Sequence, residues 1–164
     1  MLSLDQVVEH ILVTGAICVA LIALCVMLFY EILGHVWVRL PKLDGRPRTQ
    51  IFVTIFSVFA GHTLAIWLFG LVYYVLSVHA DFGSMHGVHS NELISYVYFS
   101  GATYSSVGFG DVYVQGPLRM IATVEVLLGL ILIGWSVTFT YLVTDKFLLH
   151  KRAHHESKKG KTHG

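Results

Sequence analysis

The sequence predicts an all-α membrane protein with three transmembrane helices and one shorter helix that enters the membrane and returns. Hydrophobic residues make up 55% of the 164 residues, charged residues only 13%, and the mean hydropathy is +0.68. The apolar residues stand in long blocks rather than in short alternating runs. So few charges cannot cover a water-facing surface, which predicts an integral membrane protein surrounded by the lipid bilayer. A net charge of +1 gives no reason to expect a nucleic-acid partner.

The first predicted transmembrane helix belongs to an N-terminal segment, residues 1–34. Residues 11–30 carry no charge and reach the length of about 20 residues that a helix needs to cross the hydrocarbon. A cleaved signal peptide would begin with basic residues, whereas the residues before this block include Asp5 and Glu9 and no Lys or Arg. We therefore interpret the block as a genuine span.

Two further spans and a short apolar stretch follow. The second span covers residues 51–78 and the third residues 117–145, with Glu125 as its internal charge. Between them, residues 93–103 form an apolar stretch of about eleven residues, which is too short to cross. This stretch is the predicted re-entrant helix.

The basic residues of the connections predict the orientation. They gather in the linker 35–50 and in the tail 146–164, as Arg39, Lys42, Arg46, Arg48, Lys146, Lys151, Arg152, Lys158, Lys159 and Lys161. The N-terminus and the outer loop 79–91 contain no Lys or Arg. Cytoplasmic connections carry the excess of positive charge, so the N-terminus is predicted outside the cell membrane and the C-terminus in the cytoplasm.

The segment between the second and third spans reads SVGFGD at residues 106–111. Gly108 and Gly110 can take positive φ cheaply, and alternating backbone handedness turns successive carbonyl groups to the same side. Irregular backbone at membrane depth is tolerated where it is buried in protein or lines a water-filled path. Four such strands around an axis would stack rings of carbonyl oxygens that replace the water around a cation. Ser106 would add a hydroxyl at the inner end, and Asp111 a ring of carboxylates near the outer mouth.

This segment resembles the TVGYGD signature of the potassium channel pore-loop family, and the resemblance covers about residues 92–145. It implies a homotetramer that conducts K⁺ passively, with no cofactor and no enzymatic activity. It also implies a pore domain over 51–145, with an outer helix 51–78, an outer loop 79–91, a pore helix 92–104, a selectivity filter 106–111 and an inner helix 117–145. The implied K⁺ ligands are oxygens of Ser106, Val107, Gly108, Phe109 and Gly110, and Asp111 closes the filter.

Three positions depart from the commonest form of the signature. Ser106 stands where threonine is usual, and Phe109 stands where tyrosine is usual, so a phenol hydroxyl is lost. Ala102 stands nine residues before Asp111, where some relatives carry a glutamate that pairs with this aspartate. A non-selective monovalent cation channel of the same architecture is therefore the alternative prediction.

Four residues are predicted to support the filter. The aromatic residues Tyr98, Phe99 and Tyr104 would form a cuff around it. Glu125 is an intramembrane carboxylate that should lie level with the filter, hydrogen-bonded near Tyr104 or Ser105, because a bare carboxylate in a membrane is costly. Direct ion binding by Glu125 is the other interpretation.

Residues of the third span are candidates for gating. Gly129 stands where relatives carry a flexible hinge glycine, although a close-packing glycine between helices is equally common in membranes. Below it, residues at three- and four-residue spacing would line the cavity and a lower gate, or pack against neighbouring helices: Leu130, Ile133, Val137 and Tyr141.

The histidines leave several interpretations open. His79, His86 and His89 of the outer loop would sense pH, bind a divalent metal or simply be solvated. A histidine-ligated redox protein is a remote alternative, because it needs two histidines at matching depth and only His62 lies well inside a span. The basic tail 146–164 is predicted to be disordered and to contact anionic cytoplasmic lipid.

Overall fold

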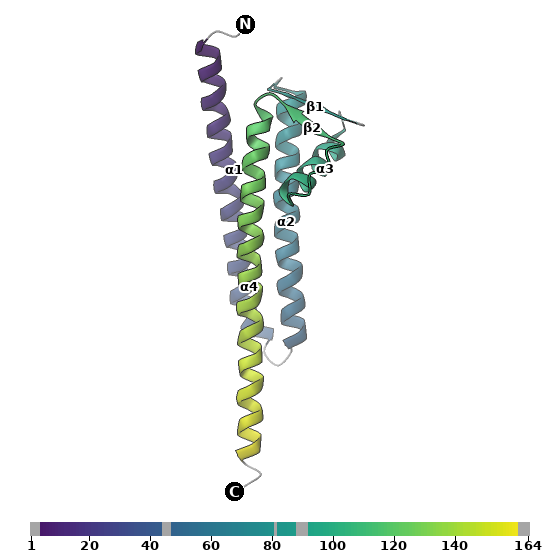
Figure 1. The fold of residues 1–164 in the computed structure, drawn as a ribbon. Coiled ribbons are helices and arrows are strands. Elements are labelled where there is room, and N and C mark those ends of the chain that lie inside the picture. The colour runs from purple at the N-terminus through teal and green to yellow at the C-terminus, as the bar shows by residue number, and fades with distance from the viewer. Residues whose placement is uncertain (1–3, 44–46, 81, 88–91, 161–164) are drawn as a thin grey trace.

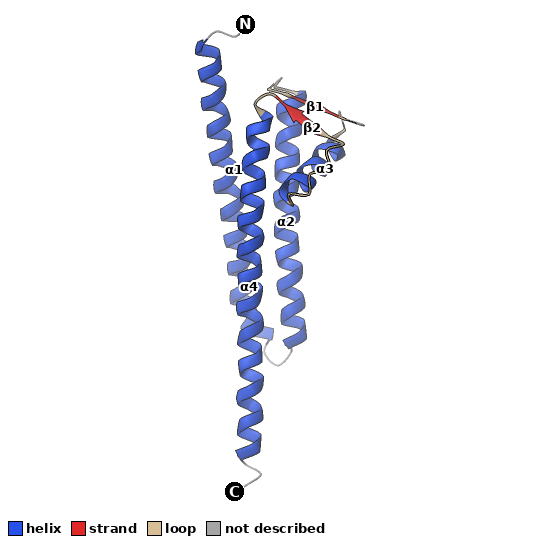
Figure 2. Ribbon diagram, in the orientation of Figure 1, coloured by secondary structure: helices blue, strands red, loops and turns tan. Residues whose placement is uncertain are grey.

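Three long helices and one short helix make up most of the structure (Figures 1 and 2). The computed structural model describes residues 4–43, 47–80, 82–87 and 92–160. Its elements, in chain order, are α1 (Leu4–Arg39), η1 (Leu40–Leu43), α2 (Pro47–Val78), β1 (Ser84–His86), α3 (Leu93–Tyr104), β2 (Tyr113–Gln115) and α4 (Leu118–Gly160).

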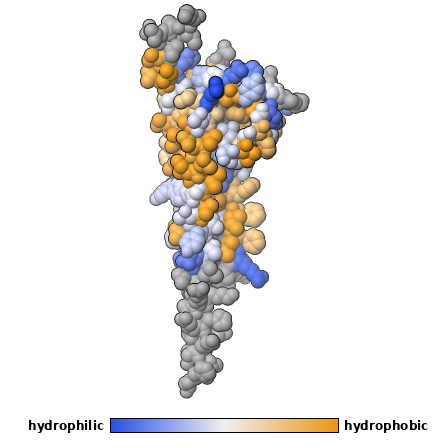
Figure 3. All heavy atoms as spheres, in the orientation of Figure 1, coloured by the Kyte–Doolittle hydropathy of each residue, from blue (hydrophilic) through white to orange (hydrophobic). Residues whose placement is uncertain are grey.

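The three long helices are long and apolar enough to cross a membrane. The candidate spans are Val8–Arg39, Arg48–Val78 and Leu118–Lys146, so the prediction of a helical membrane protein with three spans is confirmed. Many large apolar side chains face outward, and Figure 3 shows them gathered over much of the visible surface. In lipid this exposure costs little, because the surrounding solvent is itself apolar.

Helices α1 and α2 are longer than the sequence predicts. Helix α1 continues past residue 34 to Arg39, and α2 begins at Pro47 rather than at residue 51. The described part of the basic linker is therefore helical. Arg39 and Arg48 stand at the ends of these helices, where long basic side chains can extend out of the apolar region.

Helix α3 packs against both α2 and α4, whereas α1 lies along the other side of the α2–α4 pair (Figure 1). Gly70 allows α3 to approach α2 closely, because a β-carbon there would lie 2.8 Å from the Cα of Val97. The side chains that fill the space between the four helices include Phe29, Phe69, Tyr73, Tyr96, Tyr104, Leu118, Ile121 and Leu132.

A small antiparallel sheet lies at one end of the bundle and was not predicted. Strands β1 and β2 pair in the register Ser84↔Gln115, Met85↔Val114 and His86↔Tyr113. The side chains of Met85 and Val114 are buried in the main core. The sheet therefore fastens the loop after α2 to the segment just before α4, at what we call the sheet end of the bundle.

The opposite end of the bundle, which we call the η1 end, is closed by contacts between α1, α2 and α4. The side chain of Gln50 donates to the carbonyl oxygen of Leu40 at 2.8 Å. Trp37 stacks edge-on against Phe139, with ring centroids 6.1 Å apart, and the Lys146 ammonium lies 5.0 Å from the Trp37 ring. Helix α1 is therefore fixed to the far half of α4 as well as to α2.

The segment after the third span differs from its prediction. Residues 146–160 continue α4 as helix rather than forming a disordered tail, and residues 161–164 lie outside the described residues. Extending an existing helix needs no new nucleus, and the segment contains no proline before Gly160.

Candidate functional site

The SVGFGD segment, residues 106–111, leaves the end of α3 with an alternating backbone. The φ angles are 57° at Ser106, 53° at Gly108 and 80° at Gly110. Among the described residues, Ser106 is the one non-glycine with positive φ, so Val107 and Phe109 have negative φ. The positive φ predicted for the two glycines is confirmed, and Ser106 extends the alternation by one residue. Left- and right-handed residues in alternation place successive carbonyl groups on one side of the strand.

Hydrogen bonds hold the start of this segment against the end of α3. The amide of Ser106 donates to the carbonyl of Thr103 at 2.9 Å, and the amide of Gly108 donates to the carbonyl of Ala102 at 3.0 Å. A β-carbon at Gly108 or Gly110 would meet none of the described atoms within 4 Å. Within one chain, glycine is therefore favoured at these two positions by the backbone conformation, and not because a side chain would lack space.

Tyr98 supports the far end of the segment. Its ring stacks on Phe109, with centroids 6.2 Å apart and planes 7° from parallel. Its hydroxyl donates to Oδ2 of Asp111 at 3.0 Å, and the amide of Val112 donates to Oδ1 at 3.1 Å. Ala102 stands where the predicted pairing with Asp111 would need a glutamate. The Tyr98 hydroxyl, one turn earlier in α3, binds the Asp111 carboxylate instead.

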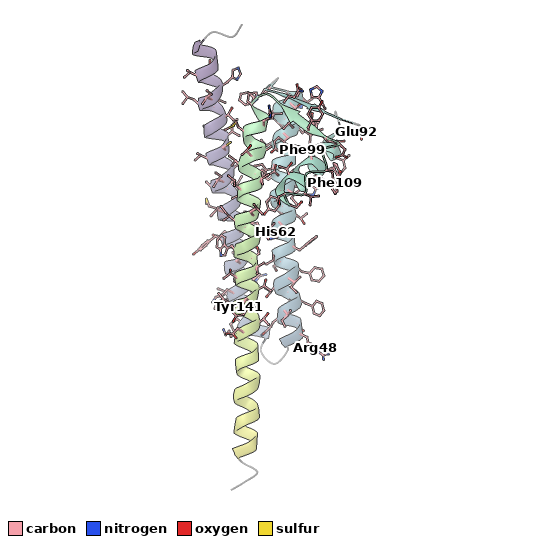
Figure 4. The ribbon with its side chains drawn as sticks, in the orientation of Figure 1. Arg48, His62, Glu92, Phe99, Phe109 and Tyr141 are labelled. Carbon is pink, nitrogen blue, oxygen red and sulfur yellow. The ribbon has the colours of Figure 1, made fainter. Side chains whose placement is uncertain are left out.

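The other two predicted cuff residues face away from the SVGFGD segment. Phe99 is buried and packs edge-on against Tyr73 of α2, with centroids 5.2 Å apart (Figure 4). Tyr104 is also buried, and its hydroxyl lies 2.8 Å from Nδ1 of His62. Successive residues of a helix point about 100° apart, so Phe99 packs toward α2 while Tyr98 lies against the segment. Among the described contacts within one chain, Tyr98 is the one of the three that touches the segment, and the cuff role of Phe99 and Tyr104 stays a prediction.

Glu125 is fully buried and faces α2 and α3. It accepts hydrogen bonds from Tyr73 at 2.6 Å and from Ser100 at 2.5 Å. The Ser100 hydroxyl also lies 2.8 Å from the carbonyl of Ile66. These partners differ from the predicted Tyr104 and Ser105, which lie one turn further along α3. The carboxyl group thus joins the three helices behind the SVGFGD segment.

Gly129 is buried against the last residue of α3. A β-carbon on Gly129 would overlap the carbonyl oxygen of Tyr104, so this position requires glycine for close packing. The contact gives this glycine a packing role, and the hinge at Gly129 stays a prediction.

The four cavity candidates do not share one environment. Leu130, Val137 and Tyr141 are 50%, 65% and 66% exposed and lie on an open face of α4. Ile133 is partly buried and packs against the main core. The structure thus leaves three of the four free to face an axis or a neighbouring chain.

The histidines lie in separate places. Both ring nitrogens of His62 have partners, Tyr104 at 2.8 Å and Ser136 at 3.0 Å, so neither is free to ligate a haem iron in this arrangement. His79 contacts the ring of Tyr74, and His86 stacks on Tyr113. His89 lies outside the described residues. In the part of the chain that the structure describes, no three His, Cys, Asp or Glu side chains gather as a metal site.

Sequence reasoning missed the partners that build this site. Tyr73, Ser100 and Ser136 are isolated polar residues in apolar helices, and each makes a hydrogen bond to another helix. A polar side chain in hydrocarbon needs an internal partner, which is the signal that would single such residues out.

Comparison with known proteins adds the family. A family model described as "Ion channel" matches residues 61–144, just over half of the chain. The match includes α3, the SVGFGD segment and most of α2 and of the span in α4, and it excludes α1. Comparisons with curated proteins and with solved structures found no match. The chain is therefore a multi-pass membrane protein that belongs to the ion channel pore-loop family.

Proposed function

We propose that the protein is a tetrameric, potassium-selective channel that conducts K⁺ passively through residues 106–110. The observation that carries the proposal is the alternation of φ at Ser106, Gly108 and Gly110 within the sequence SVGFGD. This backbone presents a row of carbonyl oxygens, the ligands that replace the hydration shell of K⁺. In this proposal α3 is the re-entrant pore helix and α4 is the inner helix.

The K⁺ ligands would be the oxygens of Ser106, Val107, Gly108, Phe109 and Gly110. Ser106 adds its hydroxyl at the inner end of the row, and Asp111 adds a carboxylate at the outer mouth. Potassium is the permeant ion rather than a cofactor, and the transport needs no enzymatic step.

The tetramer follows from the geometry of a single strand, which cannot enclose an ion. Val107 and Phe109 are 56% and 68% exposed in one chain, and open space adjoins Gly108 and Gly110. Three further copies around a common axis would cover this surface and complete each ring of carbonyl groups. Leu130, Val137 and Tyr141 would then face the cavity below the filter.

The orientation proposed from the basic residues agrees with this arrangement. The N-terminus, the sheet end and Asp111 lie outside the cell, and the η1 end with Arg39 and Arg48 lies at the cytoplasmic face. The basic C-terminal segment would then contact anionic lipids of the inner leaflet.

A non-selective cation channel is the second candidate. It is favoured by Phe109, which stacks on Tyr98 but has no hydroxyl with which to brace the filter by a hydrogen bond. A filter held less firmly would distinguish K⁺ from Na⁺ less strictly.

Ion flux from liposomes tests both candidates. The purified protein should carry K⁺, and Gly110→Ala should abolish the flux, because φ = 80° disfavours a residue with a β-carbon. Gly34→Ala in α1 is the matched control, since a β-carbon there also meets none of the described atoms within 4 Å. Flux that survives Gly110→Ala would show that the filter assignment is wrong. A reversal potential near zero under a K⁺/Na⁺ gradient would favour the non-selective channel.

A further inference from the structure

A chain of hydrogen bonds inside the membrane connects the last residue of α3 to the middle of α4. The Tyr104 hydroxyl lies 2.8 Å from Nδ1 of His62, and Nε2 of His62 lies 3.0 Å from the Ser136 hydroxyl. Ser136 in turn donates to the carbonyl of Leu132 at 2.8 Å. The imidazole of α2 therefore bridges α3 and α4.

One arrangement of the hydroxyl protons satisfies every bond of this chain. All three bonds form together when Ser136 uses its one hydroxyl proton toward Leu132 and accepts a hydrogen bond from His62. Nε2 of His62 must then carry the proton. In a neutral imidazole Nδ1 is the acceptor, so Tyr104 donates to it. All three bonds are made by one tautomer, with the order Tyr104, His62, Ser136, Leu132.

Packing around the imidazole holds it in place. Its ring lies 4.8 Å from the ring of Phe29 in α1 and meets the edge of Tyr104 at 5.7 Å. The neighbouring Gly61 is also packed against Phe29, because a β-carbon there would lie 3.2 Å from that ring. The partly buried His62 thus contacts side chains from all three other helices.

Tyr104 is held to α4 at two points. Its backbone carbonyl packs against Gly129, and its hydroxyl reaches Ser136 through His62. Ser136 follows Gly129 by seven residues, or about 10 Å along the helix. A bend of about 15° at Gly129 would move Ser136 sideways by about 2.7 Å. A hydrogen bond of 3.0 Å does not survive such a displacement.

We propose that His62 is a positioning residue that couples the inner end of the selectivity filter to the straight form of α4. Tyr104 lies two residues before Ser106, so its position sets that of the innermost proposed K⁺ ligand. The bridge is intact in this structure, where α4 runs as one unbroken helix (Figure 1), and it would break on an outward swing of the lower half of α4. His62 therefore favours the unbent inner helix and the filter geometry that accompanies it. This inference rests on the proposed channel function.

Single-channel recording of the full tetramer in planar bilayers tests the coupling. His62→Phe keeps an aromatic ring beside Phe29 and removes both hydrogen bonds. In this proposal the unbent α4 is the closed form, so we expect the ratio of open to closed times to rise about three- to tenfold, the size expected for losing the one hydrogen bond that the bend breaks. Tyr104→Phe should shift the ratio in the same direction, and the double variant should shift it no further than either change alone. His62→Gln, which keeps one acceptor and one donor, should restore much of the original ratio.

Two control variants separate the bridge from general effects of substitution. His35→Phe makes the same replacement where the imidazole bonds only its own helix, to Glu31. Thr63→Val removes a hydroxyl that bonds only the carbonyl of Phe59 in α2. Both should leave the ratio within about twofold, which is below the effect of a buried hydrogen bond. If His62→Phe behaves like these controls while Gly110→Ala still abolishes flux, the coupling is wrong and the channel assignment stands.

A second measurement tests the proposal even if the His62→Phe variant does not assemble into a channel. Nitrogen NMR of the unsubstituted channel should show an unprotonated Nδ1 and a protonated Nε2 at His62, and Tyr104→Phe should shift the Nδ1 resonance alone. The opposite tautomer, or an Nδ1 resonance that does not shift in the Tyr104→Phe variant, would overturn the proposal.

Discussion

The backbone carbonyl of Tyr104 rests directly on Gly129, so the end of α3 and the middle of α4 touch without an intervening side chain. A β-carbon at Gly129 would lie within 3.0 Å of that oxygen, a separation that real β-carbons do not show. Gly129→Ala should therefore lower the free energy of unfolding by about 1–3 kcal/mol, despite the better helix propensity of alanine. Thermal unfolding in detergent would measure the loss.

Gly134→Ala is the matched control for this contact. The position lies five residues further along α4, and a β-carbon there meets none of the described atoms within 4 Å. Within the chain, this change should be neutral or stabilising by up to about 1 kcal/mol. Equal effects at both glycines would argue against a packing role for Gly129.

Substitution of Glu125 distinguishes structural support from ion binding. Gln has an oxygen that can accept from Tyr73 and an amide that can donate to Ser100, which then keeps its bond to Ile66. Glu125→Gln should therefore retain both stability and conductance. Glu125→Ala leaves the buried Tyr73 hydroxyl unpaired beside a cavity and should cost at least about 2 kcal/mol. A large fall in conductance with Glu125→Gln at unchanged stability would show that the charge itself acts on the ion.

The bond between Tyr98 and Asp111 predicts a role in selectivity. Tyr98→Phe keeps the stack on Phe109 and removes the hydroxyl that binds the carboxylate. We expect the K⁺/Na⁺ permeability ratio to fall by about two- to tenfold, as for one hydrogen bond of ordinary strength. Reversal potentials would measure the ratio. Asp111→Asn should lower the permeability ratio less in the Tyr98→Phe channel than in the unsubstituted channel. Fully additive effects of the two substitutions would mean that the two residues act separately.

Trp37 should matter more to the bundle than other exposed tryptophans. It contacts Phe139 and lies under the Lys146 ammonium, both on α4. Trp37→Ala should therefore destabilise the protein by about 1–2 kcal/mol through lost packing and the lost cation–π contact. Trp67 of α2 is similarly exposed, at 47% against 45%. Trp67→Ala is thus the control, and an equal fall in melting temperature for both would mean that the η1 end is not held by this contact.

Much of the fold follows from the sequence because crossing a membrane is a demanding requirement. Length and lack of charge predict the three spans, and a stretch too short to cross predicts α3 almost to the residue. The positive φ of Gly108 and Gly110 follows from alternation of glycine in the SVGFGD segment. These features are local, so the residues that produce them are neighbours in the chain.

The contacts between helices are harder to predict. Helix α2 is apolar on all sides, so its sequence has no polar face from which to infer which way it is turned. Tyr73 and Glu125, and His62 and Tyr104, meet only because the helices adopt one particular rotation. The strands β1 and β2 are three residues each, too short to give a pattern. Helical propagation through 146–160 depends on the preceding helix more than on its own composition.

The bond from Gln50 to Leu40 has a consequence for how the protein is made. It closes the turn between α1 and α2 with one residue of η1 and one of α2, both of which leave the ribosome before α3. The two helices can therefore enter the bilayer as a finished hairpin, with the hydrogen-bonding groups of the turn already partly satisfied. When α3 and α4 are synthesised, they pack against a surface that α1 and α2 have already formed and that includes His62 and Tyr73. The order of synthesis thus gives the last two helices a fixed template, so a fault in this turn should appear as a failure of assembly rather than of conduction.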